Sequence, residues 1–238
     1  MKRREFLTSF AALGVATSLP IARAEVVTGG QPWESGTAST PPAPPRQGGL
    51  QYLTQHEFDT VGAIAERFIP ADELSISGKE AGCATFIDRQ LAGDYGNAAA
   101  LYRLGKFVKG TPEQGPQSSL TPAQRYRQGL AALDAYTQRQ SGKPFVALPG
   151  AEQDRLLHAM EADALDLGPE VETKVLFELL LQNVREGFLS DPIYGGNKEM
   201  ASWKMIGFPG ARYDFRDLLS KKGQKLNIIP TSLIDNTL

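Results

Sequence analysis

The side chains that could carry out acid–base or metal chemistry are few in this chain of 238 residues. Five carboxylates fall within one short stretch, where paired acids could serve as general acid and general base. They are Glu161, Asp163, Asp166, Glu170 and Glu172. The stretch lies between two predicted helices, and acidic residues at a helix start interact favourably with its dipole. A solvated acidic face therefore accounts for them without catalysis.

The histidines and serines form no recognisable catalytic arrangement. His56 and His158 are the only histidines, and neither lies in a His-Glu-x-x-His or Glu-x-x-His motif, so a helical metal site is unsupported. Ser190 and Ser202 lack the surroundings of a nucleophile elbow. No Gly-x-Gly-x-x-Gly follows a strand-like run, and no Cys-x-x-Cys-His is present. We therefore expect no dinucleotide, c-type haem or iron–sulfur cluster in this chain.

Cys83 is the only cysteine, so the chain cannot form an internal disulfide. It is flanked by Gly82 and Ala84, which is typical of a small residue packed in a core. In an oxidising compartment a lone cysteine can also pair with another chain. Both a buried thiol and an intersubunit disulfide remain open from the sequence.

The first 24 residues predict export by the bacterial twin-arginine route. A charged start is followed by an apolar run from about Leu7 to Ile21 and a small-x-small cleavage site. The residues on which this prediction depends are Arg3, Arg4, Phe6, Leu7, Ala22 and Ala24. This translocase carries folded proteins, most often ones that received a cofactor in the cytoplasm. Since no cofactor motif follows, the signal indicates an escort for a cofactor-containing partner that has no signal of its own.

Charge and hydropathy limit the other partners. The formal net charge is −2 and no basic stripe follows the signal, so nucleic-acid binding is not expected. No later window has the apolar length of a membrane span, so we expect membrane association only through partners. Residues 25–49 are rich in Pro, Gly, Ser and Thr and predict an arm or linker. Residues 220–238 form a C-terminal tail that either frays or docks onto another chain.

Residues 50–219 predict a compact, mainly α-helical domain. Thr54 and Glu57 form a capping box, and Thr121 with Gln124 forms a second one ahead of Pro122. Apolar residues at helical spacing predict helices around residues 55–68, 86–92, 101–109, 122–141, 150–160 and 170–189. No stretch shows sustained period-two alternation, so a sheet domain is not expected.

An irregular, aromatic-rich segment follows the last of these helices. Phe188, Tyr194, Trp203 and Phe208 lie among turn residues between 187 and 210. The rings either fold inward and cap the long helix or form a partner interface with Tyr194, Trp203 and Phe208 as anchors. The candidate interface residues are Asp191, Pro192, Tyr194, Gly195, Gly196, Asn197, Trp203, Gly207, Phe208, Pro209 and Gly210.

The same segment resembles a known family. The run from Asp191 to Asn197 reads Asp-Pro-Ile-Tyr-Gly-Gly-Asn, and the run from Trp203 ends in Gly-Phe-Pro-Gly. Both are similar to gluconate 2-dehydrogenase subunit 3, the small subunit of bacterial membrane-bound, flavin-dependent sugar dehydrogenases. The resemblance extends over about residues 50–219, including the Phe68–Asp72 and Leu120–Pro122 stretches and the paired-arginine signal. It leaves out the arm and the tail.

The resemblance implies a subunit without chemistry of its own. Complexes of this type contain a large subunit that holds FAD and oxidises a sugar or sugar acid, and the partner subunits also hold an iron–sulfur cluster and c-type haem. A multihaem cytochrome c subunit passes the electrons on, and the small subunit carries the flavoprotein through the twin-arginine translocase. The expected location is the periplasm, on the membrane through the complex. The alternative that the sequence leaves open is an independent exported helical enzyme or ligand-binding protein.

Overall fold

The part of the chain that the structure describes is helical, as predicted. The computed structural model describes residues 48–101, 105–106, 108, 110–111, 114, 118–212, 214–224, 226 and 228–233, so the predicted signal and nearly all of the arm lie outside it. The α-helices of this part are α2 (Gln55–Phe68), α3 (Cys83–Ala92), α4 (Pro122–Ser141), α5 (Gly150–Glu161), α6 (Thr173–Leu189) and α7 (Ala201–Ile206). Four short 3-10 helices accompany them, and these residues include no β-strand.

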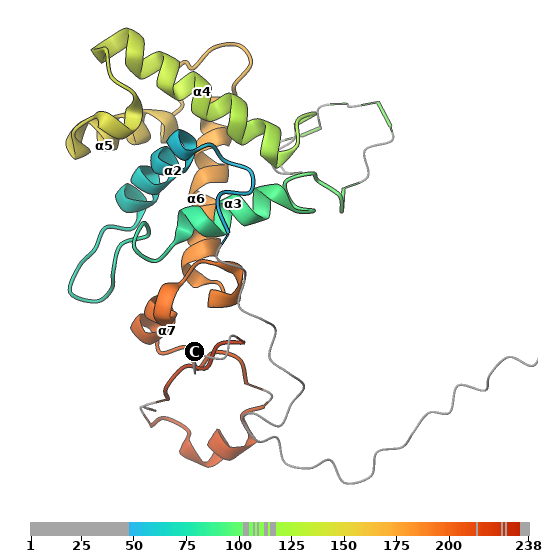
Figure 1. Ribbon diagram of the computed structural model, residues 1–238. Coiled ribbons are helices and arrows are strands. Elements are labelled where there is room, and N and C mark those ends of the chain that lie inside the picture. Colours follow the sequence, from blue (N-terminus) through green and yellow to red (C-terminus); the bar gives the residue numbers. More distant parts are fainter. Residues whose placement is uncertain are drawn as a thin grey trace, which may run out of the picture. The chain divides into compact units, whose positions relative to one another are not determined.

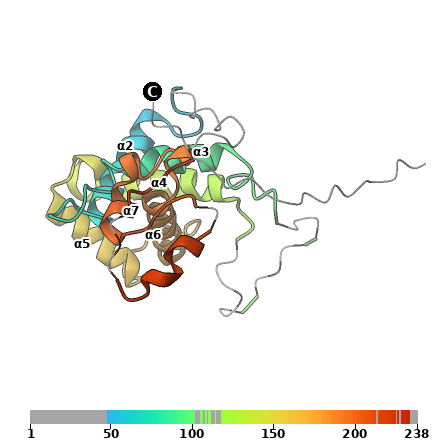
Figure 2. The ribbon, with the colours of Figure 1, turned by 90° about the horizontal axis from the view of Figure 1, so that it is seen from below.

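Helix α6 is the centre of the core. Helices α2, α3, α4 and α5 all contact it, and α7 packs near its C-terminal end. Figure 1 shows α6 running between these helices, and Figure 2 shows it in the middle of them when viewed from below. Its buried residues include Leu176, Leu180, Val184 and Phe188. The strongly apolar sequence of α6 thus follows from its contact with neighbours on several sides.

Local sequence signals start the helices where predicted. Thr54 Oγ1 accepts from the Glu57 amide at 3.2 Å, and the Glu57 carboxylate accepts from the Thr54 amide at 2.8 Å. The Thr121 hydroxyl and the Gln124 side chain exchange the same two bonds at the start of α4. Each box satisfies two amides that the helix itself leaves unpaired.

Two helix predictions were wrong in detail. Helix α6 begins at Thr173 because Gly168, with φ +112°, and the Val171 amide bonded to its carbonyl keep the chain in a turn. Glu172 is the N-cap residue of α6 and so lies at the helix start, whereas Glu170 lies outside the helix and no acidic residue lies in its first turn. The helix predicted around 101–109 is absent from the described residues of that stretch. Leu101 and Val108 are exposed there, and a short helix without packing is unstable.

The segment that precedes α2 is held by a buried carboxylate on α3. Asp88, 3% exposed, accepts hydrogen bonds from the amides of Gln51, Tyr52 and Leu53 at 2.7–2.9 Å. A second buried polar centre joins α4 to α6, where the hydroxyl of the fully buried Tyr126 donates to Asn183 Oδ1 at 3.0 Å. These two sets of hydrogen bonds fix the relative positions of the elements that they join, because buried polar groups need specific partners.

Candidate functional site

The candidate interface is more ordered than the irregular loop that the sequence predicted. After α6 the chain forms two 3-10 helices, η3 (Pro192–Tyr194) and η4 (Lys198–Met200), and then the six-residue helix α7. Pro192 is the first residue of η3, and Gly207 ends α7 in the left-handed conformation at φ +71°. The sequence missed α7 because so short a helix carries little periodicity.

Gly82 and Gly196 allow this segment to lie directly on α3 and α6. A Cβ at Gly196 would lie 2.1 Å from the carbonyl oxygen of Gly187 in α6. A Cβ at Gly82, ahead of α3, would lie 2.7 Å from the carbonyl oxygen of Gly195. Such separations exclude any side chain, so the glycines serve a close approach of backbones. The backbone that approaches them here belongs to this same chain.

Asn197 fixes the turn between η3 and η4. Its side chain is fully buried, and its backbone is left-handed at φ +47°. Its Oδ1 accepts from the amide and hydroxyl of Ser202 at 3.0 and 2.8 Å, and its Nδ2 donates to the Ser190 carbonyl at 2.8 Å. Asparagine tolerates this backbone region, and its amide satisfies three groups at once. Asn197 is therefore part of the internal structure of the segment.

The aromatic rings divide into two inward and two outward ones. Trp203 is 5% exposed and its indole N–H donates to the Leu189 carbonyl at 2.9 Å, so it caps the end of α6. Phe188 is also buried. Phe208 is 43% exposed and stacks edge-on against Trp203 at 5.1 Å, and Tyr194 is 50% exposed. Of the three anchors that the sequence suggested, Tyr194 and Phe208 face outward.

Asp191 and Gly210 join the C-terminal segment to this region. The Asp191 carboxylate accepts from the amides of Ile193 and Leu233 and from the Ser232 hydroxyl, at 2.7–3.0 Å. Gly210 pairs with Thr231 in a parallel β-bridge, and a Cβ at Gly210 would lie 2.1 Å from the Thr231 carbonyl oxygen. Residues 231–233 of the tail thus dock on their own chain. No sequence signal predicts the contact between Asp191 and Ser232, which lie 41 positions apart.

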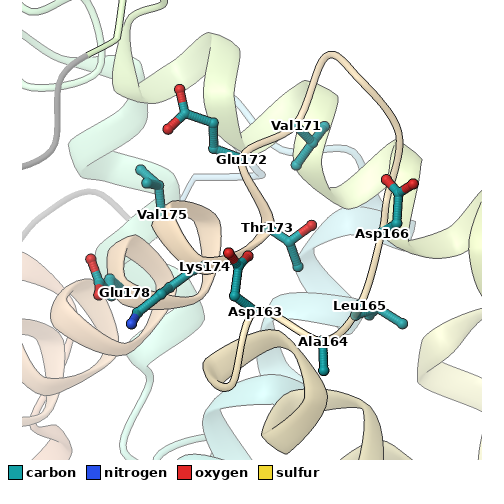
Figure 3. A pocket seen from close by; sticks show the side chains of 10 residues that line it. All are labelled: Asp163, Ala164, Leu165, Asp166, Val171, Glu172, Thr173, Lys174, Val175 and Glu178. Atoms are coloured by element: carbon teal, nitrogen blue, oxygen red, sulfur yellow. The ribbon is translucent and has the colours of Figure 1, made fainter. Parts of the chain in front are cut away.

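Three carboxylates of the acidic stretch, Asp163, Asp166 and Glu172, line an open depression. Figure 3 shows this depression, which has a volume of about 560 Å³ and is lined by residues 163–166 and by the start of α6. Glu172 and Asp166 lie at opposite edges of it, and Asp163 lies at its lower edge in this view (Figure 3). Lys174 lies among the carboxylates. Across the described residues, no group of His, Cys, Asp or Glu is arranged to hold a metal ion.

Cys83 and the histidines occupy structural positions. Cys83 is fully buried at the start of α3 and its thiol lies 3.5 Å from the Val184 carbonyl. Burial raises the pKa of the Cys83 thiol to about 12, which leaves it protonated and unreactive at neutral pH. His56 is half exposed and pairs with Asp134 of α4. His158 is exposed beside Glu161. The geometry thus favours the buried-thiol alternative for Cys83.

Exposed apolar side chains gather in the C-terminal third of the chain. Of the 15 large hydrophobic residues exposed in the described part, ten lie between residues 189 and 233. They are Leu189, Tyr194, Met205, Ile206, Phe208, Phe215, Leu219, Leu226, Ile229 and Leu233. Exposed apolar residues concentrated in one region are typical of an interaction surface. No helix of the described part has the length and apolar character needed to span a bilayer.

Comparison with known proteins places this region in a family. Residues 55–210 match the family model described as gluconate 2-dehydrogenase subunit 3, which is well over half of the chain. The match includes the whole candidate interface and ends at Gly210, before the docked C-terminal segment. Comparisons with curated proteins and with solved structures found no match. The chain therefore belongs to the gluconate 2-dehydrogenase subunit 3 family, whose name implies association with other dehydrogenase subunits.

Proposed function

We propose that this chain is the non-catalytic small subunit of a periplasmic, FAD-dependent sugar or sugar-acid dehydrogenase complex, and that it escorts the flavoprotein through the twin-arginine translocase. The observation that carries the proposal is the combination of family membership with the Arg3-Arg4 signal. Folded export suits a partner that has bound its cofactor in the cytoplasm. FAD, an iron–sulfur cluster and c-type haem would then belong to the partner subunits, and substrate oxidation would take place on the flavoprotein.

The surface of the chain supports a binding role. Tyr194 and Phe208 expose aromatic rings on a segment that is held firmly on α3 and α6. Rigid, exposed rings are well suited to binding because little conformational entropy is lost when they are covered. The carboxylates around the depression at the start of α6 lie apart from one another and give no comparable support to a catalytic role.

The direct test is purification of the full chain, tagged at its C-terminus, from its native membranes in mild detergent. We expect two further chains to co-elute, with the absorption bands of flavin and of c-type haem. A solitary, colourless chain recovered in good yield would contradict the subunit proposal. Turnover of a sugar or binding of a small ligand by the isolated mature chain would favour the independent exported protein instead.

The escort function has its own test. Changing Arg3→Lys together with Arg4→Lys keeps the charge but removes the paired arginines, so both this chain and the dehydrogenase activity should remain in the cytoplasm. The matched control is Arg23→Lys, the same substitution elsewhere in the predicted signal, which should leave periplasmic activity unchanged. Periplasmic dehydrogenase activity in the double variant would show that the partner is exported independently of this chain.

A further inference from the structure

We propose that residues 228–233 form a strap that completes the partner-binding surface, with Ile229 and Leu233 as outward-facing contact residues and Asp191 as the residue that holds the strap in place. The inference rests on the proposed function and extends it. The strap lies beyond the family match, which ends at Gly210, so the binding surface would combine a segment inside the match with one outside it.

The strap is attached at two points. The Thr231 amide donates to the Pro209 carbonyl at 3.1 Å, and the Ala211 amide donates to the Thr231 carbonyl at 2.7 Å. Asp191 then holds the next two residues through the Ser232 hydroxyl and the Leu233 amide. The same carboxylate accepts from Ile193 at the start of η3. One side chain thus couples the strap to the turn that carries Tyr194.

Buried and exposed side chains alternate along the strap, and the large apolar ones are the exposed ones. Pro230 and Ser232 are buried, whereas Ile229 and Leu233 are 84% and 46% exposed. An extended segment directs successive side chains to opposite faces, and one that only covered a core would direct its large apolar residues inward. Here the smaller residues hold the strap and the larger apolar ones remain in solvent. They are placed to be covered by another molecule.

The charge of the segment to which the strap bonds indicates the charge of the molecule that covers it. Residues 198–225 contain seven Lys or Arg against three Asp or Glu, although the whole chain has a formal charge of −2. Lys198, Lys204, Lys221 and Lys222 are exposed. The strap bonds to Pro209 and Ala211, which lie within this positively charged segment, so the strap fits a partner that presents an apolar patch beside acidic side chains. The charge disfavours a second copy of this chain, since two positively charged segments would repel each other.

The occupant that we infer is therefore a dehydrogenase subunit that presents an apolar patch beside acidic side chains. The test compares the tagged full chain with its Ile229→Lys variant in the native-membrane purification. The substitution leaves the fold intact because Ile229 is the most exposed large apolar residue described, so helicity and thermal midpoint should not change. Recovery of the dehydrogenase subunit should fall about tenfold or more, since a buried apolar contact is replaced by a charge.

Leu74→Lys is the matched control. Leu74 is 68% exposed but lies between α2 and α3, outside the C-terminal region, and the substitution adds the same charge. It should leave recovery of the dehydrogenase subunit unchanged. Asp191→Ala tests the positioning role of Asp191. Hydrogen exchange of the Thr231 and Ala211 amides should become faster, and recovery of the dehydrogenase subunit should fall. Asp191→Asn retains one acceptor oxygen, so its amide exchange and its recovery of the dehydrogenase subunit should both lie between those of Asp191→Ala and the unaltered chain.

The outcomes separate this inference from the proposed function. If the unaltered chain recovers the dehydrogenase subunit and Ile229→Lys recovers it equally well, the strap is not in the interface and the subunit proposal stands. If the unaltered chain recovers no dehydrogenase subunit, both are overturned. Two results with the isolated mature chain would replace the occupant: a dimer abolished by Ile229→Lys, or binding to phosphatidylglycerol vesicles that Ile229→Lys removes.

Discussion

Trp203 was expected from the sequence to anchor a partner, and the structure leads to a different prediction for its removal. The indole is 5% exposed, donates to the last carbonyl of α6 and stacks on Phe208. Truncation of a buried Trp to Ala costs about 3–5 kcal/mol, and the lost hydrogen bond is about 1 kcal/mol of the total. Trp203→Ala should therefore destabilise α7 in the isolated chain. Trp203→Phe keeps most of the volume and should cost only about 1–2 kcal/mol.

Amide hydrogen exchange of the isolated mature chain is the appropriate assay, because α7 can open without global unfolding. The Gly207 and Phe208 amides both donate to the Trp203 carbonyl and report directly on α7. A loss of about 3 kcal/mol corresponds to roughly a hundredfold faster exchange at these amides. Phe208→Ala is the comparison, since its ring is 43% exposed and should cost less. Unchanged exchange in Trp203→Ala, together with lost recovery of the dehydrogenase subunit, would refute the internal role.

Two further predictions concern buried groups on α3. Asp88→Ala removes the acceptor of three backbone amides and should lower the free energy of unfolding, measured by urea denaturation, by about 3 kcal/mol or more. Asp88→Asn keeps one acceptor oxygen and should lower the free energy of unfolding clearly less. Equal effects of the two substitutions would contradict the hydrogen-bond argument. The Cys83 thiol should resist a disulfide reagent at pH 8 until the chain is unfolded. Burial raises the pKa of the Cys83 thiol from 9.0 to about 12, so the unfolded state loses the thiol proton at a lower pH than the folded state does. The free energy of unfolding should therefore fall between about pH 9 and 12, by up to about 1.4 kcal/mol per pH unit. Cys83→Ala should remove this contribution.

The elements predicted well from the sequence are those governed by local chemistry. The capping boxes at Thr54 and Thr121 and the apolar periodicity of α6 depend on residues within a few positions of one another. Such signals survive folding because tertiary contacts reinforce them. Residues 101–109 have comparable apolar spacing, yet Leu101 and Val108 are exposed and the described residues of this stretch lie outside any helix. Periodicity predicts a helix only where something packs against it.

The candidate site was predicted in its location but not in its organisation. The sequence shows an unusual run of glycines and rings, yet it cannot show that Gly196 meets Gly187 or that Trp203 meets Leu189. Nor does any local pattern join Asp191 to Ser232. These contacts depend on how α6 and the tail bring distant backbones together. Sequence reasoning therefore could not separate residues that hold the segment from residues that it presents.

That separation changes how the motif of this segment is interpreted. Gly195, Gly196 and Asn197 hold the turn against α3 and α6, and Asp191 holds both the turn and the strap. Tyr194, in the middle of the same motif, is half exposed. The motif is thus a rigid support for a few outward side chains, because a Cβ added at Gly196 would collide with the backbone of Gly187 and displace the segment. Substitutions at Gly196 and at Tyr194 should then differ in kind: the first should alter the isolated chain, and the second only its binding.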